Sequence, residues 1–333
     1  MKKGMAIYLA AILLFLLPCS LSVADETECQ YEAKADIDFS MRDKPDNQSR
    51  KLSKVKAGKY VMVLEYGDEW SKIMYEGEVG YARSKWLYKF RSMDPYLYKV
   101  PNYEAPYGLG IMQADVNTKG KSRISSYKSI QLEKGQTVTV HRYDADTDVA
   151  TVLIWRTYID LEPGAVAVTP FVPYEDAEAG DIIAGYTTYM PRDYGEPYSD
   201  NRRYNLVRAT ERINYAVLYP GTLFSFNELA GGYGKEGEYM RAKIVGGSGV
   251  AAGGGVCQIS VLVFSMALML PFKIESWGMH TAKGLSYCLR ECDATVSTSQ
   301  DLTFCNMLDY AVEFRFVHNE SQTAYTVYLI RAE

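Results

Sequence analysis

Two residues of the chain, Cys257 and His280, are suited to nucleophilic chemistry and lie 23 positions apart. Cys257 follows a glycine triplet at residues 253–255 and opens an apolar run that stops at Pro271. We expect a buried helix over residues 257–270, because the run is long enough for one and apolar on all sides. The positive end of a helix dipole stabilises a thiolate and lowers the cysteine pKa. This position favours a reactive thiol over the alternative, a small buried cysteine packed under a helix.

A reactive thiol needs a base, and the chain contains three histidines, His141, His280 and His318. We expect a surface or packing role for His141, which lies in a β-rich segment, and an exposed turn position for His318. His280 follows a predicted strand, and the helix can return that strand to the thiol. A Cys–His couple supplies a strong nucleophile and then a proton donor for the leaving amine. The alternative is an ordinary exposed histidine before a turn.

A third residue would orient the imidazole through its other ring nitrogen. Asp293 is our candidate for this role, with Asp301 as second choice. The alternative is that these aspartates only form turns between strands. At the mouth of the helix, the backbone N–H groups of Val256 and Cys257 are expected to stabilise an oxyanion.

Other binding chemistries are less well supported by the sequence. The spacing Cys288-x3-Cys292 lacks the two-residue gap usual for zinc, and no Gly-Lys-Ser/Thr follows the glycine triplet. We therefore predict no metal and no cofactor. The net charge is −5, without a basic stripe, which argues against nucleic acid or an anionic membrane as a partner.

The amino-terminal segment predicts export. Lys2-Lys3, an apolar run over residues 5–17 and Ser22-Val23-Ala24 together form a signal peptide over residues 1–24. The apolar run is short for a membrane-spanning helix. Cys19 hints at lipoprotein processing, but Pro18 beside it makes a poor match. We therefore expect a secreted, extracytoplasmic protein with no membrane span after cleavage.

Cleavage would leave an odd number of cysteines in a compartment where thiols normally pair. Four of them could form two disulfides and leave Cys257 as the free thiol. These four are Cys29, Cys288, Cys292 and Cys305.

Residues 34–92 predict a small all-β barrel, because short alternating runs at 59–64, 70–75 and 79–82 are separated by turn signals. The segment resembles the bacterial SH3 domain. The resemblance rests on Met41-Arg42 with Pro45, Ala57-Gly58, Trp70, Gly77 to Tyr81, and Trp86-Leu87. It implies binding to cell-wall peptides or glycans. The alternative is a spacer whose aromatic residues only fill the core.

Two further domains are expected. Residues 100–174 repeat the β-rich pattern and predict a second SH3-like or small β domain. Residues 181–333 carry a helical stripe over 202–219 and then the helix after the glycines. Short predicted strands follow at 272–276, 285–289, 295–297, 302–305, 311–317 and 325–330. Helices followed by strands indicate an α+β fold.

Residues 186–330 resemble the VanW-like domain family. The resemblance is carried by Pro220-Gly221-x-x-Phe224-Ser225-Phe226-Asn227, Gly253-Gly254-Gly255-Val256-Cys257-Gln258, His280 and Asp293-Ala294-Thr295. Some members are described as L,D-transpeptidases that cross-link peptidoglycan through a cysteine, which implies Cys257 as nucleophile and His280 as base. Candidates for substrate or oxyanion binding lie in the first two of these blocks: Gly255, Val256, Gln258 and Asn227. The chain departs from the family pattern at Glu238-Tyr239 and at Glu291-Cys292.

The sequence thus predicts an exported, cell-wall-associated acyl transferase of the cysteine L,D-transpeptidase type, acting on peptidoglycan stem peptides. The alternative is a non-catalytic peptidoglycan-binding or accessory module in which Cys257 is structural.

Overall fold

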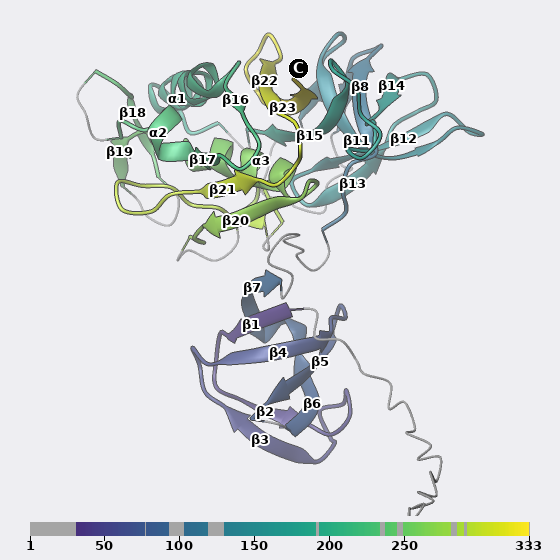
Figure 1. Ribbon diagram of the computed structural model, residues 1–333, viewed down its shortest axis with the longest axis vertical. Coiled ribbons are helices and arrows are strands. Elements are labelled where there is room, and N and C mark those ends of the chain that lie inside the picture. Colours follow the sequence, from purple (N-terminus) through teal and green to yellow (C-terminus); the bar gives the residue numbers. More distant parts are fainter. Residues whose placement is uncertain are drawn as a thin grey trace, which may run out of the picture.

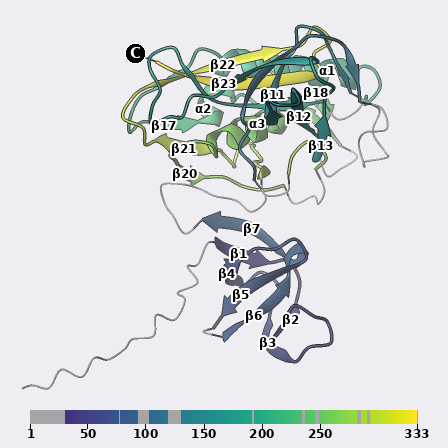
Figure 2. The same ribbon diagram turned by 90° about the vertical axis from the view of Figure 1, so that its right-hand side faces the viewer.

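The computed structural model describes residues 31–76, 78–92, 103–118, 130–190, 193–233, 237–244, 249–280, 285–289 and 292–332. The predicted signal peptide and Cys29 lie outside these residues. The described part of the chain is mostly β structure (Figures 1 and 2). It has two separate hydrophobic cores, one in residues 33–90 and one in the remainder. Among the described helices, none is long and apolar enough to cross a membrane.

The N-terminal body is an antiparallel sheet in the strand order β3-β2-β6-β5-β4-β1-β7. Alternation builds its core: in β4, Val61 and Val63 are buried while Tyr60 and Met62 face solvent. The expected SH3-like, all-β organisation is therefore present in this segment. The strands are β1 (Tyr31–Ala35), β2 (Phe39–Arg42), β3 (Lys51–Val55), β4 (Tyr60–Glu65), β5 (Trp70–Tyr75), β6 (Glu78–Arg83) and β7 (Leu87–Ser92).

The next segment forms a five-stranded antiparallel sheet in the order β13-β12-β11-β8-β14, with β9 and β10 paired beside it. Its buried side chains belong to the same core as the C-terminal residues, and the Thr139 N–H donates to Thr187 Oγ1 at 2.8 Å. The predicted boundary between a domain of residues 100–174 and a domain of residues 181–333 stays a prediction. The strands are β8 (Gly108–Met112), β9 (Val116–Asn117), β10 (Gln131–Leu132), β11 (Thr137–Asp144), β12 (Val149–Ile154), β13 (Thr157–Asp160) and β14 (Val166–Pro170).

The C-terminal segment contains a four-stranded antiparallel sheet, β15-β23-β22-β16, and a three-stranded sheet, β17-β21-β20. Helix α3 lies between these sheets (Figure 1) and contacts β15, β23 and α1. The strands are β15 (Ile182–Tyr189), β16 (Val217–Leu218), β17 (Leu223–Ser225), β18 (Arg241–Lys243), β19 (Val250–Ala252), β20 (Phe272–Ser276), β21 (Thr303–Asn306), β22 (Val312–His318) and β23 (Ala324–Arg331). The helices are α1 (Tyr198–Ile213), α2 (Phe226–Ala230) and α3 (Cys257–Ala267).

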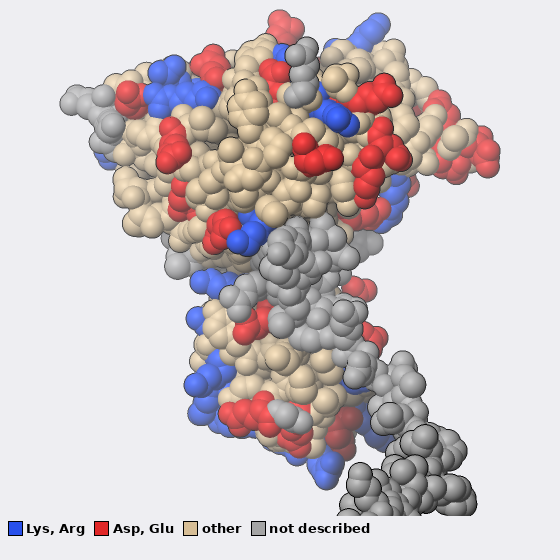
Figure 3. Space-filling model, viewed as in Figure 1, with Lys and Arg blue, Asp and Glu red and all other residues tan. Residues whose placement is uncertain are grey.

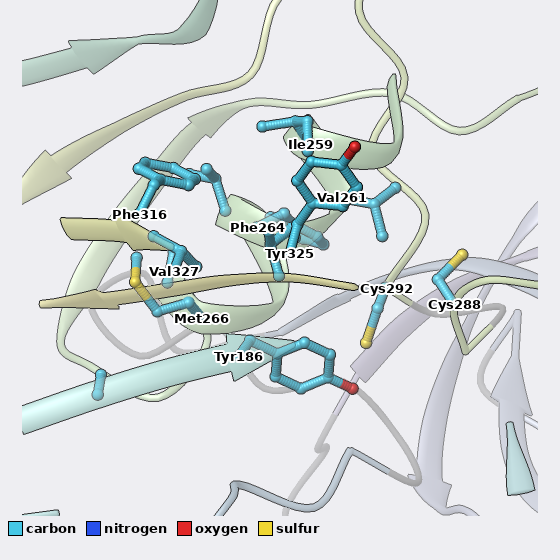
Figure 4. Close-up of a cluster of buried hydrophobic side chains, with 14 of the residues drawn as sticks. Tyr186, Ile259, Val261, Phe264, Met266, Cys288, Cys292, Phe316, Tyr325 and Val327 are labelled. Carbon is cyan, nitrogen blue, oxygen red and sulfur yellow. The ribbon is translucent and has the colours of Figure 1, made fainter. Parts of the chain in front are cut away.

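The helix expected after the glycine triplet is present and buried. Every residue of α3 after Cys257 is buried. Figure 4 shows Ile259, Phe264 and Met266 among sheet residues such as Tyr325. The helix stops at Ala267, short of the predicted residue 270. A proline ring clashes with the carbonyl four residues before it, and Pro271 stands four residues after Ala267.

Two of the predicted strands are wrong. Residues 285–289 form a bend, because the Arg156 guanidinium binds the carbonyl oxygens of Leu285 and Cys288 in place of a neighbouring strand. Residues 295–297 do not form a strand either. The Thr295 N–H donates to the Gly278 carbonyl at 2.7 Å, and the Ser297 N–H donates to Gln300 at 2.8 Å, which closes a turn.

Three arginines of α1 lie within ion-pair range of carboxylates. Arg203 lies beside Asp200, and Arg208 and Arg212 lie beside Glu238. Basic and acidic side chains are likewise interspersed on the face of the protein in view in Figure 3.

The expected disulfides are not formed among the cysteines that the structure describes. Cys257, Cys288, Cys292 and Cys305 form no disulfide with one another. Cys288 and Cys292 are both buried, and their sulfur atoms point in different directions (Figure 4). A disulfide requires the two Cβ–S bonds to converge, so this arrangement does not allow one.

Candidate active site

The glycine triplet before α3 is required by close packing. Gly253 and Gly255 have φ angles of 75° and 105°, a region that favours glycine. A Cβ on Gly255 would lie 2.8 Å from Arg202 Cγ, and one on Gly254 would lie 2.3 Å from the Ala242 carbonyl oxygen. The triplet therefore lets the chain pass between α1 and β18 and enter α3 at Cys257.

A buried hydrogen-bond chain holds the first turn of α3. Arg202 is 1% exposed, and its Nη2 donates to Gln258 Oε1 at 2.7 Å. Gln258 Nε2 donates in turn to the Tyr189 carbonyl at 2.8 Å and to Thr188 Oγ1 at 3.0 Å. Gln258, a predicted substrate-binding residue, is fully buried, so its side chain ties α3 to α1 and β15.

His280 is held by Asp293 at two points. His280 Nδ1 lies 2.7 Å from Asp293 Oδ1, and the His280 backbone N–H donates to Asp293 Oδ2 at 2.7 Å. Asp293 is 4% exposed, so the pair is shielded from water. Asp301, the second choice for this role, instead accepts hydrogen bonds from Ser225 Oγ and the Asn227 N–H at the start of α2.

The imidazole of His280 and the thiol of Cys257 lie in the wall of the same pocket, and their interaction lowers the pKa of the thiol and raises that of the imidazole. Because Nδ1 is engaged by Asp293, the other ring nitrogen serves the thiol. The sulfur also lies 3.6 Å from Thr295 Oγ1 and donates to the Val296 carbonyl at 3.3 Å. The structure therefore brings together Cys257, His280 and Asp293, three residues that the sequence separates by up to 36 positions.

The electrostatics of the site favour a thiolate–imidazolium pair. Burial opposes charge on both groups, but the interaction with His280, helped by Val296 and Thr295, outweighs it and lowers the pKa of Cys257 below its ordinary value. Asp293 and Cys257 together outweigh burial in the same way and raise the pKa of His280 to about 9. Both shifts favour the charged pair, in which the sulfur is the nucleophile and the imidazole the proton donor.

A pocket of about 550 Å³ opens over Cys257. Cys257 and His280 lie in its wall, and no Asp or Glu is among the described residues that line it. Gly255 and Val256 line it as well, and the β18–β19 hairpin contributes Arg241.

Backbone donors at the helix start differ from the expected set. The Val256 N–H donates to the Gly253 carbonyl at 3.0 Å and is therefore already used. The N–H groups of Gly255 and Cys257 have no hydrogen-bond partner within the described part of the chain. These two groups are the better candidates for binding an oxyanion.

Asn227 lies away from the pocket wall. Its Nδ2 donates to the carbonyl oxygens of Ser297 at 2.9 Å and Gln300 at 3.1 Å. Ser297 lines the pocket, so Asn227 supports the wall and does not face a ligand.

The remaining histidines are outside the site. His141 is buried between the rings of Tyr158 and Tyr186 at centroid distances of 5.6 and 5.5 Å. His318 is exposed at the end of β22, as expected.

Sequence reasoning missed several residues around the thiol. Thr295 belongs to the motif Asp293-Ala294-Thr295, from which only the aspartate was selected as a candidate. The same motif could have indicated Thr295. Tyr287 and Arg241 also line the pocket. The pattern around Tyr287 indicated only a strand, and Arg241 lies outside the recognised motifs. Arg202 carried no signal of burial, because its neighbours on α1 are charged. For a metal, the described residues offer no group of three or more His, Cys, Asp or Glu side chains.

The chain contains a VanW-like domain and a bacterial SH3 domain. Residues 201–328 match the family described as VanW like protein, and residues 39–88 match the bacterial SH3 domain. The match to the VanW family covers the site around Cys257.

Two curated proteins are similar to this chain. One is the uncharacterized protein YoaR of Bacillus subtilis, 27% identical over 40% of this chain and 43% of its own length. The other is the vancomycin B-type resistance protein VanW of Enterococcus faecalis, 31% identical over 30% of this chain and 38% of its own length. The chain thus spans less than half the length of these relatives.

Proposed function

We propose that this protein is a cysteine acyl transferase of the L,D-transpeptidase type that acts on stem peptides of peptidoglycan. The observation that carries the proposal is the placement of Cys257 and His280 in the wall of one pocket, with Asp293 hydrogen-bonded to the imidazole. A structural cysteine would need neither a histidine held by a buried carboxylate nor an adjoining pocket of about 550 Å³.

In the first step, the Cys257 thiolate attacks the carbonyl carbon of the third stem residue. An S–C bond forms, and the carbonyl oxygen becomes an oxyanion within reach of the Gly255 and Cys257 N–H groups. The oxyanion then collapses and the C–N bond breaks. The His280 imidazolium gives its proton to the departing amine, which leaves as the terminal D-amino acid.

In the second step, the side-chain amine of another stem attacks the thioester. Neutral His280 takes the proton from this amine, the new amide bond forms, and the C–S bond breaks to return the Cys257 thiolate. Water in place of the amine would give a free carboxylate, which is a carboxypeptidase outcome. Asp293 keeps the imidazole in one orientation and stabilises its charge through both steps.

The two domain families point to association with the bacterial cell wall, outside the cytoplasm. The relative from Enterococcus faecalis is named for vancomycin resistance. We propose peptidoglycan as the partner, with the SH3-like body as a second point of attachment.

The test is incubation of the protein with tetrapeptide-bearing muropeptides, followed by mass spectrometry. Wild type is expected to form a thioester adduct at Cys257 and to release D-alanine or produce cross-linked dimers. Cys257→Ala should give neither product and should keep the fold, because it removes one sulfur atom. Wall binding without any adduct or product, across pH and donor length, would instead favour the accessory-module alternative.

A further inference from the structure

One cation of the pocket has no carboxylate partner within the described part of the chain. Arg241 lines the pocket from β18, and its Nη2 donates to the Val250 carbonyl at 2.9 Å. This is the one hydrogen bond of its side chain to a described residue. A guanidinium carries five N–H donors, so most of the fork stays available to a ligand.

The described residues of the site do not compensate the charge of Arg241. Among the described lining residues His280 is the other cationic group, and it is balanced by Asp293 and by the Cys257 thiolate. No acidic side chain is among the described lining residues. The pocket is therefore suited to an anion that binds near Arg241 and apart from the sulfur.

The backbone around Arg241 is tied firmly to the helix start. Asn201 Nδ2 donates to the Arg241 carbonyl at 2.8 Å. Asn205 Nδ2 bridges the carbonyl oxygens of Met240 and Gly254 at 2.9 and 3.0 Å. Arg241 also pairs in register with Ala252, directly before the glycine triplet. The position of β18 relative to Cys257 is thus fixed by both α1 and β19.

The size of the pocket limits the length of the ligand it can hold. A volume of about 550 Å³ is that of a small-molecule site and suits a short peptide segment. The fork of an arginine matches the two oxygens of a carboxylate. We propose that Arg241 binds the free terminal carboxylate of the donor peptide, on the residue that leaves when Cys257 is acylated.

This inference rests on the proposed function, and it states which donor peptides the first step of that function accepts. Arg241 would select donors that end in a free carboxylate. Because that carboxylate departs with the leaving residue, Arg241 would act on acylation and not on the attack by the second amine.

The test compares a tetrapeptide stem fragment with its C-terminal amide. Wild type is expected to acylate the free acid about 10- to 100-fold faster than the amide, the range for one charge-assisted hydrogen bond. Arg241→Gln should lose this preference by slowing only the free-acid reaction, and Arg241→Lys should keep part of it.

Lys243→Gln is the matched control. Lys243 stands two residues further on the same strand, but its ammonium lies over the Tyr198 ring at 4.9 Å and it does not line the pocket. This variant should retain the full preference. An equal loss in Lys243→Gln, or an unchanged preference in Arg241→Gln, would overturn the assignment of Arg241.

A binding measurement separates this inference from the proposed chemistry. Titration calorimetry with the Cys257→Ala protein reports affinity for the two peptides without any reaction. Tighter binding of the free acid, lost on adding Arg241→Gln, supports the carboxylate site even if wild type forms no adduct. Equal affinity for the two peptides, or no binding of either, would refute it.

Discussion

Gly255 and Arg202 occupy adjoining space so closely that a Cβ on the glycine would lie 2.9 Å from Arg202 Nη1. Arg202 in turn holds Gln258 through its Nη2. The position of Cys257 in the pocket therefore depends on a contact between a glycine and a fully buried arginine.

We predict that Gly255→Ala is destabilising and nearly inactive. The φ angle of 105° disfavours any side chain, and the methyl group overlaps Arg202. Together these are expected to cost about 2–5 kcal/mol. Gly237→Ala is the control, because Gly237 also has a positive φ, 83°, but open space around it. Thermal unfolding of the two variants should differ clearly, and equal losses would argue against the packing explanation.

Asp293→Asn should shift the reactivity of Cys257 toward higher pH. In wild type, the thiolate–imidazolium pair persists from the lowered pKa of Cys257 up to about 9, where His280 loses its proton. Removing the Asp293 charge lowers the pKa of His280, and the thiolate is then less stabilised. Alkylation rates by iodoacetamide as a function of pH would report this shift.

Asp301→Asn provides the comparison for that experiment. Asp301 bonds to Ser225 and Asn227 and does not contact His280 through any hydrogen bond in the described residues. This variant should reduce stability but leave the alkylation midpoint in place. A midpoint in Asp293→Asn that matches wild type would contradict the orienting role of Asp293.

His141 is predicted to limit stability in acid. Burial, with no hydrogen bond from a described residue at either ring nitrogen, lowers its pKa from 6.5 to about 4. The unfolded chain therefore binds this proton more readily, and stability should fall as pH drops from about 6.5 toward 4. The shift corresponds to a loss of up to about 3 kcal/mol. In urea titrations His141→Phe should remove this part of the pH dependence, whereas His318→Phe should retain it.

Arg156→Ala is expected to loosen the bend that carries Tyr287 in the pocket wall. It removes the donors to the Leu285 and Cys288 carbonyls, with an expected loss of about 1–3 kcal/mol. Buried Cys288 should then react with a thiol reagent in the native protein, as judged by peptide mapping. Arg142→Ala, which breaks an exposed pair with Glu104, should leave Cys288 protected.

The local pattern of the chain was enough to predict the helix at Cys257 and most strands, because apolar periodicity reflects burial directly. Residues 285–289 could not be predicted, since their carbonyl partner, Arg156, lies 129 positions or more away. Arg202 was missed for a related reason. An arginine in a charged helix is normally solvated, and only the tertiary packing of α1 against the glycine triplet buries it.

Hydrogen bonds connect residues 103–139 to the C-terminal segment, and they limit where a truncated fragment can begin and still fold. Tyr103 Oη donates to the Ser265 carbonyl on α3, and Thr326 Oγ1 donates to the Thr137 carbonyl. A fragment beginning at residue 201, where the family match starts, would also lose β15, one of the two strands against which α3 packs. The smallest autonomous folding unit is therefore expected to begin near Tyr103, so recombinant fragments for crystallography or screening should start there.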